Sequence, residues 1–275
     1  MNGIELTATC FVDTHAHLDD ESFDGDRSAV ISRARARGIR QIINVGYQPD
    51  RWRTTIALRE RDPIFAIMLG IHPQHAEEAN PGTLQELRNL LISDQAVALG
   101  EIGLDYSRPP IDIDRQESAL VAQLELARSL NLPIVIHQRA AETDLISVLD
   151  RFPQLPPLVL HSFDGTSQLA DYAIKRNFLV GIGGLATRHK SAALREVLSR
   201  LSPDRLLLET DSPYLAPAGS AQRRNEPMLI PAIATALSPL WCLSADELGA
   251  TTTRTATATF GLTLIGGDEI AVPGP

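Results

Sequence analysis

Eight short β-rich runs, most of them followed by a longer segment of helical pattern, succeed one another along the chain. Most runs are almost continuously apolar, as expected of parallel strands that are covered on both faces. They recur at intervals of roughly 20 to 35 residues, which is the rhythm of a (β/α)8 TIM barrel of about 250 residues. The predicted strands are residues 8–12, 41–45, 64–69, 96–99, 133–136, 158–160, 178–182 and 205–208.

The segments between these runs carry helical periodicity and helix-stop signals. Residues 114–130 repeat apolar side chains at helical spacing, and Asn131 and Pro133 end the pattern. Residues 28–37 end at Gly38, which suits the left-handed conformation that follows many helices. The same pattern predicts helices over 141–152 and 166–176.

No linker or low-complexity tract divides the chain, so residues 1–275 are expected to form a single TIM-barrel domain. An open, doubly wound α/β sheet is the alternative architecture. That fold would place a glycine-rich phosphate loop after the first strand. Here the first run is followed by the sequence DTHAH, which favours the barrel.

Charge and composition narrow the functional classes. The formal net charge is −9, from 34 acidic and 25 basic residues, which argues against a broad basic surface that coats nucleic acid. A local cleft that binds nucleic acid through metal ions stays compatible with this charge.

The two cysteines, Cys10 and Cys242, suggest no disulfide framework. The N-terminus lacks the order of a signal peptide, and no run approaches the roughly 18 apolar residues of a membrane span. We therefore expect a cytoplasmic, membrane-free monomer.

Ligand-type side chains follow the predicted strands at the ends where barrel enzymes build their sites. Four of the seven histidines take such positions, whereas random placement would scatter them over helices and loops. His15 and His17 would also project to one face of a strand, because strand side chains alternate with a period of two. The strand-end residues are Asp13, His15, His17, Glu101, Asp105, His137, His161, Thr210 and Asp211.

Imidazole nitrogens and carboxylate oxygens suit zinc, manganese, magnesium or iron, whereas soft structural sites use thiolates. A catalytic zinc keeps about three protein ligands. A larger set therefore predicts two metal ions: His15, His17, Glu101, His137, His161 and Asp211. Glu101 is central in the strand order and long enough to bridge the pair. Asp211 is placed to bind a metal and to accept the proton of an activated water, so the predicted reaction is metal-assisted hydrolysis.

Two further histidines, His72 and His75, follow the third strand at the same end of the barrel. They could contact substrate, or they could shape the loop. His189 lies in a polar loop and is expected to be solvated.

Seven stretches carry these residues: DTHAHLD, GIHPQHA, GEIGLDY, IHQRAAETDLISVL, HSFDG, ETDSPYLAP and RRNEP. Together they resemble the motifs of TatD-type metal-dependent deoxyribonucleases, in the amidohydrolase-like TIM-barrel superfamily, over nearly the full chain. The resemblance implies metal ligation by the same six residues. It also implies cleavage of DNA phosphodiester bonds from the 3′ end, under Mg²⁺ or Mn²⁺.

The resemblance further implies that Arg139, Arg224 and Asn225 help to hold substrate. Arg139 could instead form a salt bridge at the barrel rim. Asn225 could instead cap the helix that follows, with Pro227 in its first turn. The chain departs from the family at Thr255, where asparagine is expected, and in residues 217–224, which are less basic than expected.

Three functions fit these observations. The first is a phosphodiesterase on DNA, and the second is an amide or ester hydrolase on the same site, such as a D-aminoacyl-tRNA deacylase. Many amidohydrolases bridge their metals with a carboxylated lysine, and here no lysine precedes Lys175, in a predicted helix. The third is a non-catalytic barrel, which fits poorly because unpaired buried ligand groups are costly without a metal.

Overall fold

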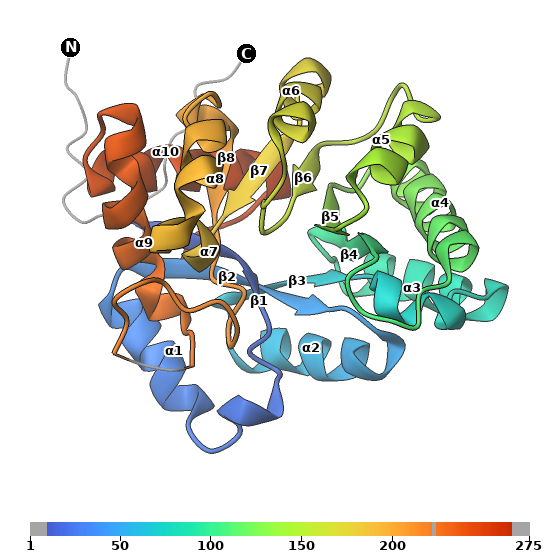
Figure 1. Ribbon diagram of the computed structural model, residues 1–275. Coiled ribbons are helices and arrows are strands. Elements are labelled where there is room, and N and C mark those ends of the chain that lie inside the picture. Colours follow the sequence, from blue (N-terminus) through green and yellow to red (C-terminus); the bar gives the residue numbers. More distant parts are fainter. Residues whose placement is uncertain (1–9, 222–223, 266–275) are drawn as a thin grey trace, which may run out of the picture.

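The computed structural model describes residues 10–221 and 224–265, and its strands form a ring that helices enclose (Figure 1). Within these residues eight strands run parallel in sequential order, each hydrogen-bonded to the next. The (β/α)8 TIM barrel predicted from the sequence is confirmed. The strands are β1 (Phe11–Ala16), β2 (Ile39–Gly46), β3 (Phe65–Leu69), β4 (Ala98–Asp105), β5 (Ile134–Arg139), β6 (Leu158–Leu160), β7 (Leu179–Ile182) and β8 (Leu206–Leu208).

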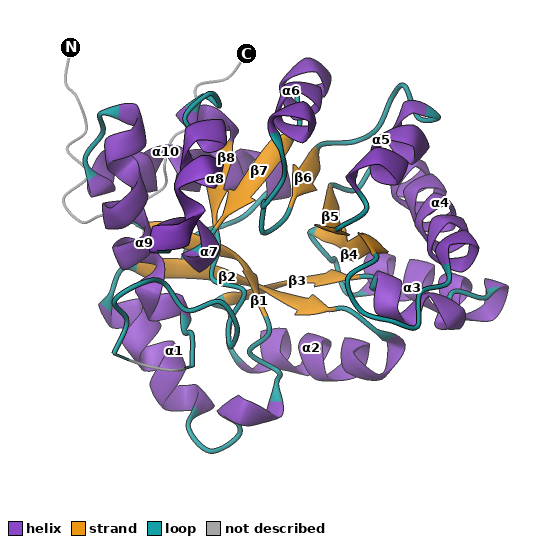
Figure 2. Cartoon of the chain, in the orientation of Figure 1, coloured by secondary structure: helices purple, strands orange, loops and turns teal. Residues whose placement is uncertain are grey.

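Helices lie outside the ring of strands (Figure 2). Their bounds are α1 (Arg27–Ala36), α2 (Pro49–Arg61), α3 (Pro81–Ser93), α4 (Ile113–Leu130), α5 (Glu142–Asp150), α6 (Ser167–Arg176), α7 (Gly184–Thr187), α8 (Ala192–Leu198), α9 (Ile230–Leu237) and α10 (Ala245–Phe260). Helix α4 ends where the sequence predicts, with Asn131 in the left-handed conformation at φ 52°. Gly38, beyond α1, has φ 83°, which a glycine adopts at no steric cost.

The strand boundaries differ from the sequence prediction most at the carboxyl ends of β1 and β4, and β5 also continues three residues beyond its predicted end, to Arg139. Strand β1 continues to Ala16, beyond the predicted end at residue 12, because its backbone pairs with β2 as far as Asn44. Residues 8 and 9 of that predicted strand lie outside the described residues. Strand β4 continues to Asp105, beyond the predicted end at residue 99, because it pairs with β5 from Ile102 onwards. The predicted "strand-end" groups His15 and Glu101 therefore lie within strands.

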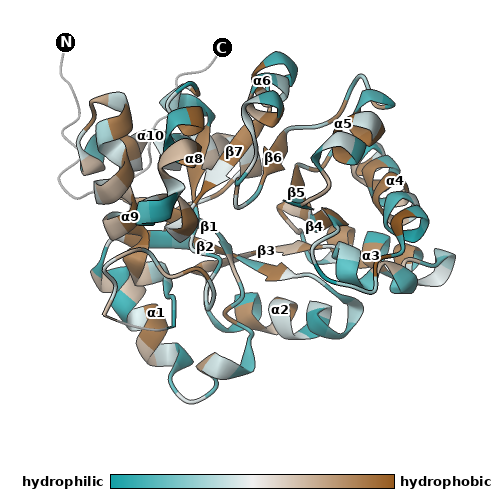
Figure 3. Cartoon of the chain, viewed as in Figure 1, coloured by the Kyte–Doolittle hydropathy of each residue, from teal (hydrophilic) through white to brown (hydrophobic). Residues whose placement is uncertain are grey.

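The core is apolar on both sides of the strands. Figure 3 shows hydrophobic residues along the strands and hydrophilic stretches on the outer helices. Among the described residues no single helix has the length and apolarity of a membrane span. The segments Pro227–Trp241 and Ala245–Phe260 have the length and apolarity of a membrane span only when they are taken together, and they are bent by 100° relative to each other. Helix α10 packs against β1 and β8.

The barrel closes between β1 and β8 through a short seam. Ala16 and Ser212 form a parallel bridge, and the N–H of His17 donates to Ser212 O (2.8 Å). The N–H of Asp211 donates to His15 O (2.8 Å) in the opposite direction. The residues that close the barrel are thus neighbours of the candidate ligands or the ligands themselves.

Candidate metal centre

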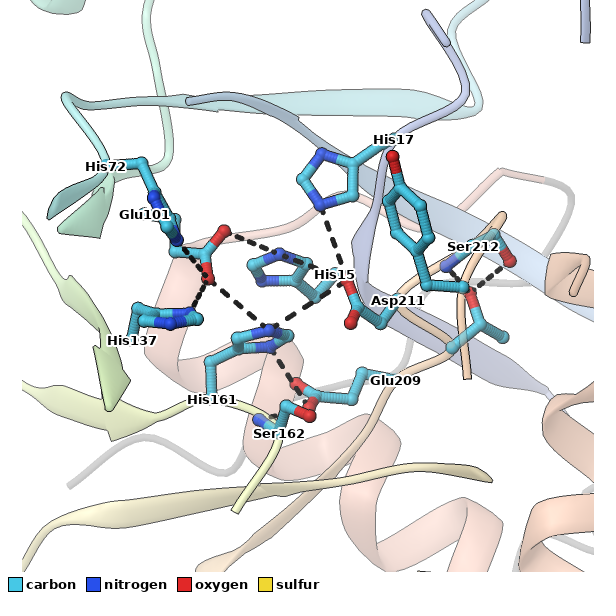
Figure 4. A network of polar contacts seen from close by, with 12 residues as sticks. His15, His17, His72, Glu101, His137, His161, Ser162, Glu209, Asp211 and Ser212 are labelled. Carbon is cyan, nitrogen blue, oxygen red and sulfur yellow. Dashed lines mark hydrogen bonds and ion pairs between the residues drawn. The ribbon is translucent and has the colours of Figure 1, made fainter. Parts of the chain in front are cut away.

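A cavity of about 740 Å³ opens at the carboxyl ends of the strands. Figure 4 shows the imidazoles and carboxylates of its base turned toward one another. We call the six predicted metal ligands the cavity floor: His15, His17, Glu101, His137, His161 and Asp211. All are buried or nearly so, and they come from β1, β4, β5 and the segments just after β1, β6 and β8. The barrel therefore brings together the whole set that the sequence predicts.

Glu101 lies at the centre of the floor. Its Oε1 is 2.6 Å from His137 Nδ1 and 3.6 Å from His161 Nε2. Its Oε2 is 3.5 Å from His15 Nε2. Burial alone would raise the pKa of Glu101, but the nearby imidazoles of His161 and His137 hold it well below its usual range. One carboxylate thus faces imidazoles on two sides, as a bridging ligand must.

Asp211 approaches the same ring nitrogen of His15 as Glu101 does. Its Oδ1 lies 4.0 Å from His15 Nε2 and 3.4 Å from His17 Nε2. Its φ is 60°, in the left-handed region that aspartate tolerates better than most residues. Burial raises its pKa, but the hydrogen bond from His17 and the charges of His161, His15 and His17 together outweigh burial and lower it. Asp211 is therefore ionised at neutral pH and can accept a proton.

A buried network fixes the turn that carries Asp211. Asp13 accepts hydrogen bonds from the Thr210 N–H (2.9 Å) and hydroxyl (2.6 Å). The Asn225 amide nitrogen donates to the carbonyls of Thr210 and Tyr214, both at 2.7 Å, on either side of Asp211. Burial raises the pKa of Asp13 to about 7. These hydrogen bonds fix the backbone before and after Asp211, and thereby the position of its side chain.

Two carboxylates stand behind two of the histidines. Asp105 Oδ2 lies 3.3 Å from His137 Nε2, and Glu209 Oε1 lies 3.1 Å from His161 Nδ1. Each leaves the other ring nitrogen facing Glu101. Carboxylate partners of this kind orient a metal-binding imidazole and raise its basicity. Gly181 leaves room for this arrangement, because a Cβ there would meet Glu209 Oε2 at 2.2 Å.

His72 faces the same cavity but has a different role. Its Nδ1 accepts a hydrogen bond from the Gln74 N–H (3.1 Å), so the proton of the neutral ring lies on Nε2. Burial lowers the pKa of His72 to about 3, so the ring is neutral. Donor atoms of His72, Asp105 and His137 lie within 4.8 Å of one another. However, a protonated Nε2 has no lone pair for a cation, which leaves His72 as a hydrogen-bond donor.

The floor fits divalent cations. Donor atoms of His15, Glu101 and His161 form one group within 4.8 Å, and those of His15, His17 and Asp211 form a second. Neither ring nitrogen of His15 has a hydrogen-bond partner among the described residues, although the ring is buried. Burial, and then His161, lower the pKa of His15 and keep it neutral. A neutral imidazole without a hydrogen-bond partner, beside the buried carboxylates of Glu101 and Asp211, is a set of ligand atoms that suits a divalent cation.

Of the other predicted substrate-binding residues, two line the cavity and two do not. Arg139 lines the cavity, and its guanidinium pairs with Asp164 (3.1 Å) and Ser162 Oγ (2.9 Å), so the salt-bridge alternative is observed. His75 lines the cavity too, 3.3 Å from Glu78.

Arg224 and Asn225 lie beside the cavity rather than in its lining. Arg224 is engaged by Asp26 (2.7 Å) and Glu226 (2.9 Å). The fully buried Asn225 bonds the backbone turn described above. The helix-cap alternative for Asn225 is wrong, because Glu226 occupies the N-cap position, where Pro227 follows as the first residue.

Sequence reasoning missed Glu209 and the bracing role of Asn225. Glu209 lies two residues before Asp211, so the period-two rule could have placed both near one face of the strand end. Asn225 gave no such signal, because it acts on carbonyls 11 and 15 residues away.

Comparison with known proteins agrees with this site. The family described as TatD related DNase matches residues 12–261. The chain is 36% identical over 257 residues to "3'-5' ssDNA/RNA exonuclease TatD" of Erwinia tasmaniensis, covering 91% of this chain and 99% of the relative. It is 34% identical over 250 residues to "Uncharacterized metal-dependent hydrolase YabD" of Bacillus subtilis, covering 90% and 98%.

Among solved structures, the chain resembles the TatD homologue YJJV of Escherichia coli. The TM-score is 0.86 at 31% identity, covering 92% of this chain and 98% of that one.

Proposed function

The chain belongs to the TatD-related DNase family of metal-dependent hydrolases, and we propose that it is a 3′ to 5′ exonuclease that hydrolyses phosphodiester bonds of single-stranded DNA. Several relatives at about 35% identity carry the name of a 3′-5′ ssDNA/RNA exonuclease. In these comparisons the matched region covers 91% of this chain.

The observation that carries the proposal is the position of Glu101 between two sets of imidazoles. We propose that these residues would hold two divalent cations, one with His15, His17 and Asp211 and the other with His137 and His161. Glu101, between the two sets, would contribute a carboxylate oxygen to each. Two cations bound there would lower the pKa of a water and offset charge on the phosphate oxygens.

The chain supplies the proton chemistry and the positioning. Asp211 is ionised and accepts the proton from the attacking water. His72 is neutral, with its Nε2 proton available to a phosphate oxygen at the cavity wall. A neutral donor stabilises developing negative charge without first losing a proton. The oxygen ligands supplied by Glu101 and Asp211 favour Mg²⁺ or Mn²⁺, and the imidazoles also accept Zn²⁺.

The test compares two substrates under three metals. Purified protein should release nucleotides from the 3′ end of single-stranded DNA with Mg²⁺ or Mn²⁺, and EDTA should abolish the release. An oligonucleotide with a phosphorothioate at its 3′ end serves as the blocked control. A D-aminoacyl-tRNA and a single-stranded RNA are assayed in parallel with Mg²⁺, Mn²⁺ and Zn²⁺.

The outcomes separate the alternatives. Cleavage of the acyl ester but of no phosphodiester under any metal would contradict the proposal in favour of a deacylase. Release from the 5′ end would contradict the stated direction alone.

A further inference from the structure

Tyr214 is an unusual side chain for this surface. It is the one aromatic among five large hydrophobic side chains that are exposed in the described residues, and the other four are isoleucines. More than half of it is exposed (54%). It lines the cavity beside the floor. An exposed aromatic ring at a cavity mouth is available to a ligand rather than to the core.

The backbone under this ring is fixed. The Tyr214 N–H donates to Asp211 O (2.8 Å), and the Tyr214 carbonyl accepts from the Asn225 amide (2.7 Å). The side chain therefore stands on an anchored turn while its ring stays uncovered. A ligand that covers such a ring needs little further ordering of the protein, which lowers the entropic cost of binding.

Tyr47 supplies a second ring next to His17. The Tyr47 ring centroid lies 5.3 Å from that of His17 at 87°, and the Tyr214 centroid lies 6.2 Å away at 64°. The His72 N–H donates to Tyr47 O (2.8 Å), which anchors this residue too. Two of the four tyrosines in the chain thus contact the ring of one floor residue, and both line the cavity.

Two arginines at the same mouth have free guanidinium groups. Arg108, after β4, and Arg188, after α7, line the cavity and are exposed. Neither side chain has a hydrogen bond or ion pair within the described part of the chain, whereas Arg139 is paired with Asp164. Two unpaired guanidinium groups and two tyrosine rings in the lining of one cavity, in a protein of net charge −9, suit a polyanion with flat bases.

We propose that Tyr47 and Tyr214 form a stacking subsite for the base of one unpaired nucleotide, with Arg108 and Arg188 meeting the adjoining phosphates. We call these four residues the cavity rim. The inference rests on the proposed function, which it extends by giving the reason for a single-stranded substrate. An interior base of a duplex is stacked on both faces and a terminal base on one face, so only an unpaired base can offer both faces to two rings. Stacking accepts every base, so the rim selects strandedness and not sequence.

The experiment pairs protein variants with a substrate that lacks the base. Single-stranded oligonucleotides carry either a normal 3′-terminal nucleotide or an abasic one, and KM and kcat are measured separately. For Tyr214→Ala and Tyr47→Ala we expect KM to rise about 5- to 150-fold on the normal end, with little change on the abasic end. Tyr214→Phe should resemble the wild type, because the phenyl ring still stacks. Ile174→Ala, on the outer helix α6, is the matched loss of an exposed hydrophobic side chain.

A second readout does not depend on cleavage. With EDTA present, wild-type protein should quench an oligonucleotide whose 3′-terminal base is 2-aminopurine, and Tyr214→Ala should not. If the wild type cleaves no nucleic acid but quenches in this way, the proposed function fails and the stacking subsite stands.

Three results would overturn the subsite. The first is equal KM effects on normal and abasic ends. The second is a loss in Tyr214→Phe as large as in Tyr214→Ala, which would assign the hydroxyl and not the ring. The third is wild-type fluorescence unchanged at saturating protein.

Discussion

The floor and the rim of one cavity are built in opposite ways. On the floor the Glu101 and His161 side chains are 6% and 3% exposed, and other protein groups hold both of them. On the rim Tyr214 is 54% exposed, and Arg108 and Arg188 have no partner among the described residues. The floor side chains are held by protein groups, whereas the Tyr214 ring and the two guanidinium groups of the rim stay open to a ligand. Substitutions on the floor should therefore change the chemical step, and those on the rim should change binding.

The largest expected effect is on the floor. Asp211→Asn removes the proton acceptor while asparagine keeps the shape and tolerates the left-handed backbone. We expect kcat on single-stranded DNA to fall about 10²- to 10⁴-fold. The thermal midpoint should stay near that of the wild type. Asp50→Asn, an exposed carboxylate at the start of α2, is the matched control. An unchanged kcat in Asp211→Asn would remove Asp211 from the role of base.

The next effect is on the support behind the floor. Glu209→Gln keeps the volume but weakens the hold on His161 Nδ1. We expect Mn²⁺ affinity to drop about 10- to 100-fold, measured by titration calorimetry. Gly181→Ala should act in the same direction, because its Cβ would displace the Glu209 carboxylate. Unaltered affinity in both variants would show that His161 needs no orienting partner.

A smaller effect belongs to the rim. Arg108→Ser and Arg188→Ser should leave kcat near the wild-type value and raise KM several-fold. For single strands the slope of log affinity against log salt is about −0.7 per neutralised phosphate. Each substitution should therefore reduce the slope by about 0.7. Arg151→Ser, on the far end of α5, gives the baseline. If the slopes of Arg108→Ser and Arg188→Ser equal that of Arg151→Ser, the two rim arginines do not contact phosphates.

The smallest effect concerns the anchor of the loop beside the rim. Hydrogen bonds from Arg224 and Arg33 lower the pKa of Asp26 from 3.8 to about 2. A lowered pKa in the folded state stabilises the protein above the unfolded value and ceases to do so as pH falls from 3.8 toward 2. The thermal midpoint of the wild type should exceed that of Asp26→Asn at pH 6, and the difference should shrink below pH 4. A difference that stays constant down to pH 2 would contradict this assignment.

The same contrast explains what the sequence could reveal. The spacing of the apolar runs predicts the barrel. The residue types near the strand ends predict the six floor residues. Hydropathy misplaced the ends of β1 and β4, because backbone pairing continues through segments that contain polar residues such as Asp13 and Asp105. The rim escaped notice, since exposure of Tyr214 depends on how the loop after β8 folds. The bracing role of Asn225 depends on that loop as well.

The β1–β8 seam has a consequence for the timing of activity. A hydrogen bond joins His15 and Asp211, which are 196 positions apart in the sequence, and another joins Asp13 and Thr210, which are 197 apart. Such distant pairings form late and slowly in folding. A nascent chain whose β8 is still inside the ribosome has no Asp211 at its cavity. The protein is therefore synthesised with its proposed base kept apart from its first histidines, and the site is assembled only when the barrel closes.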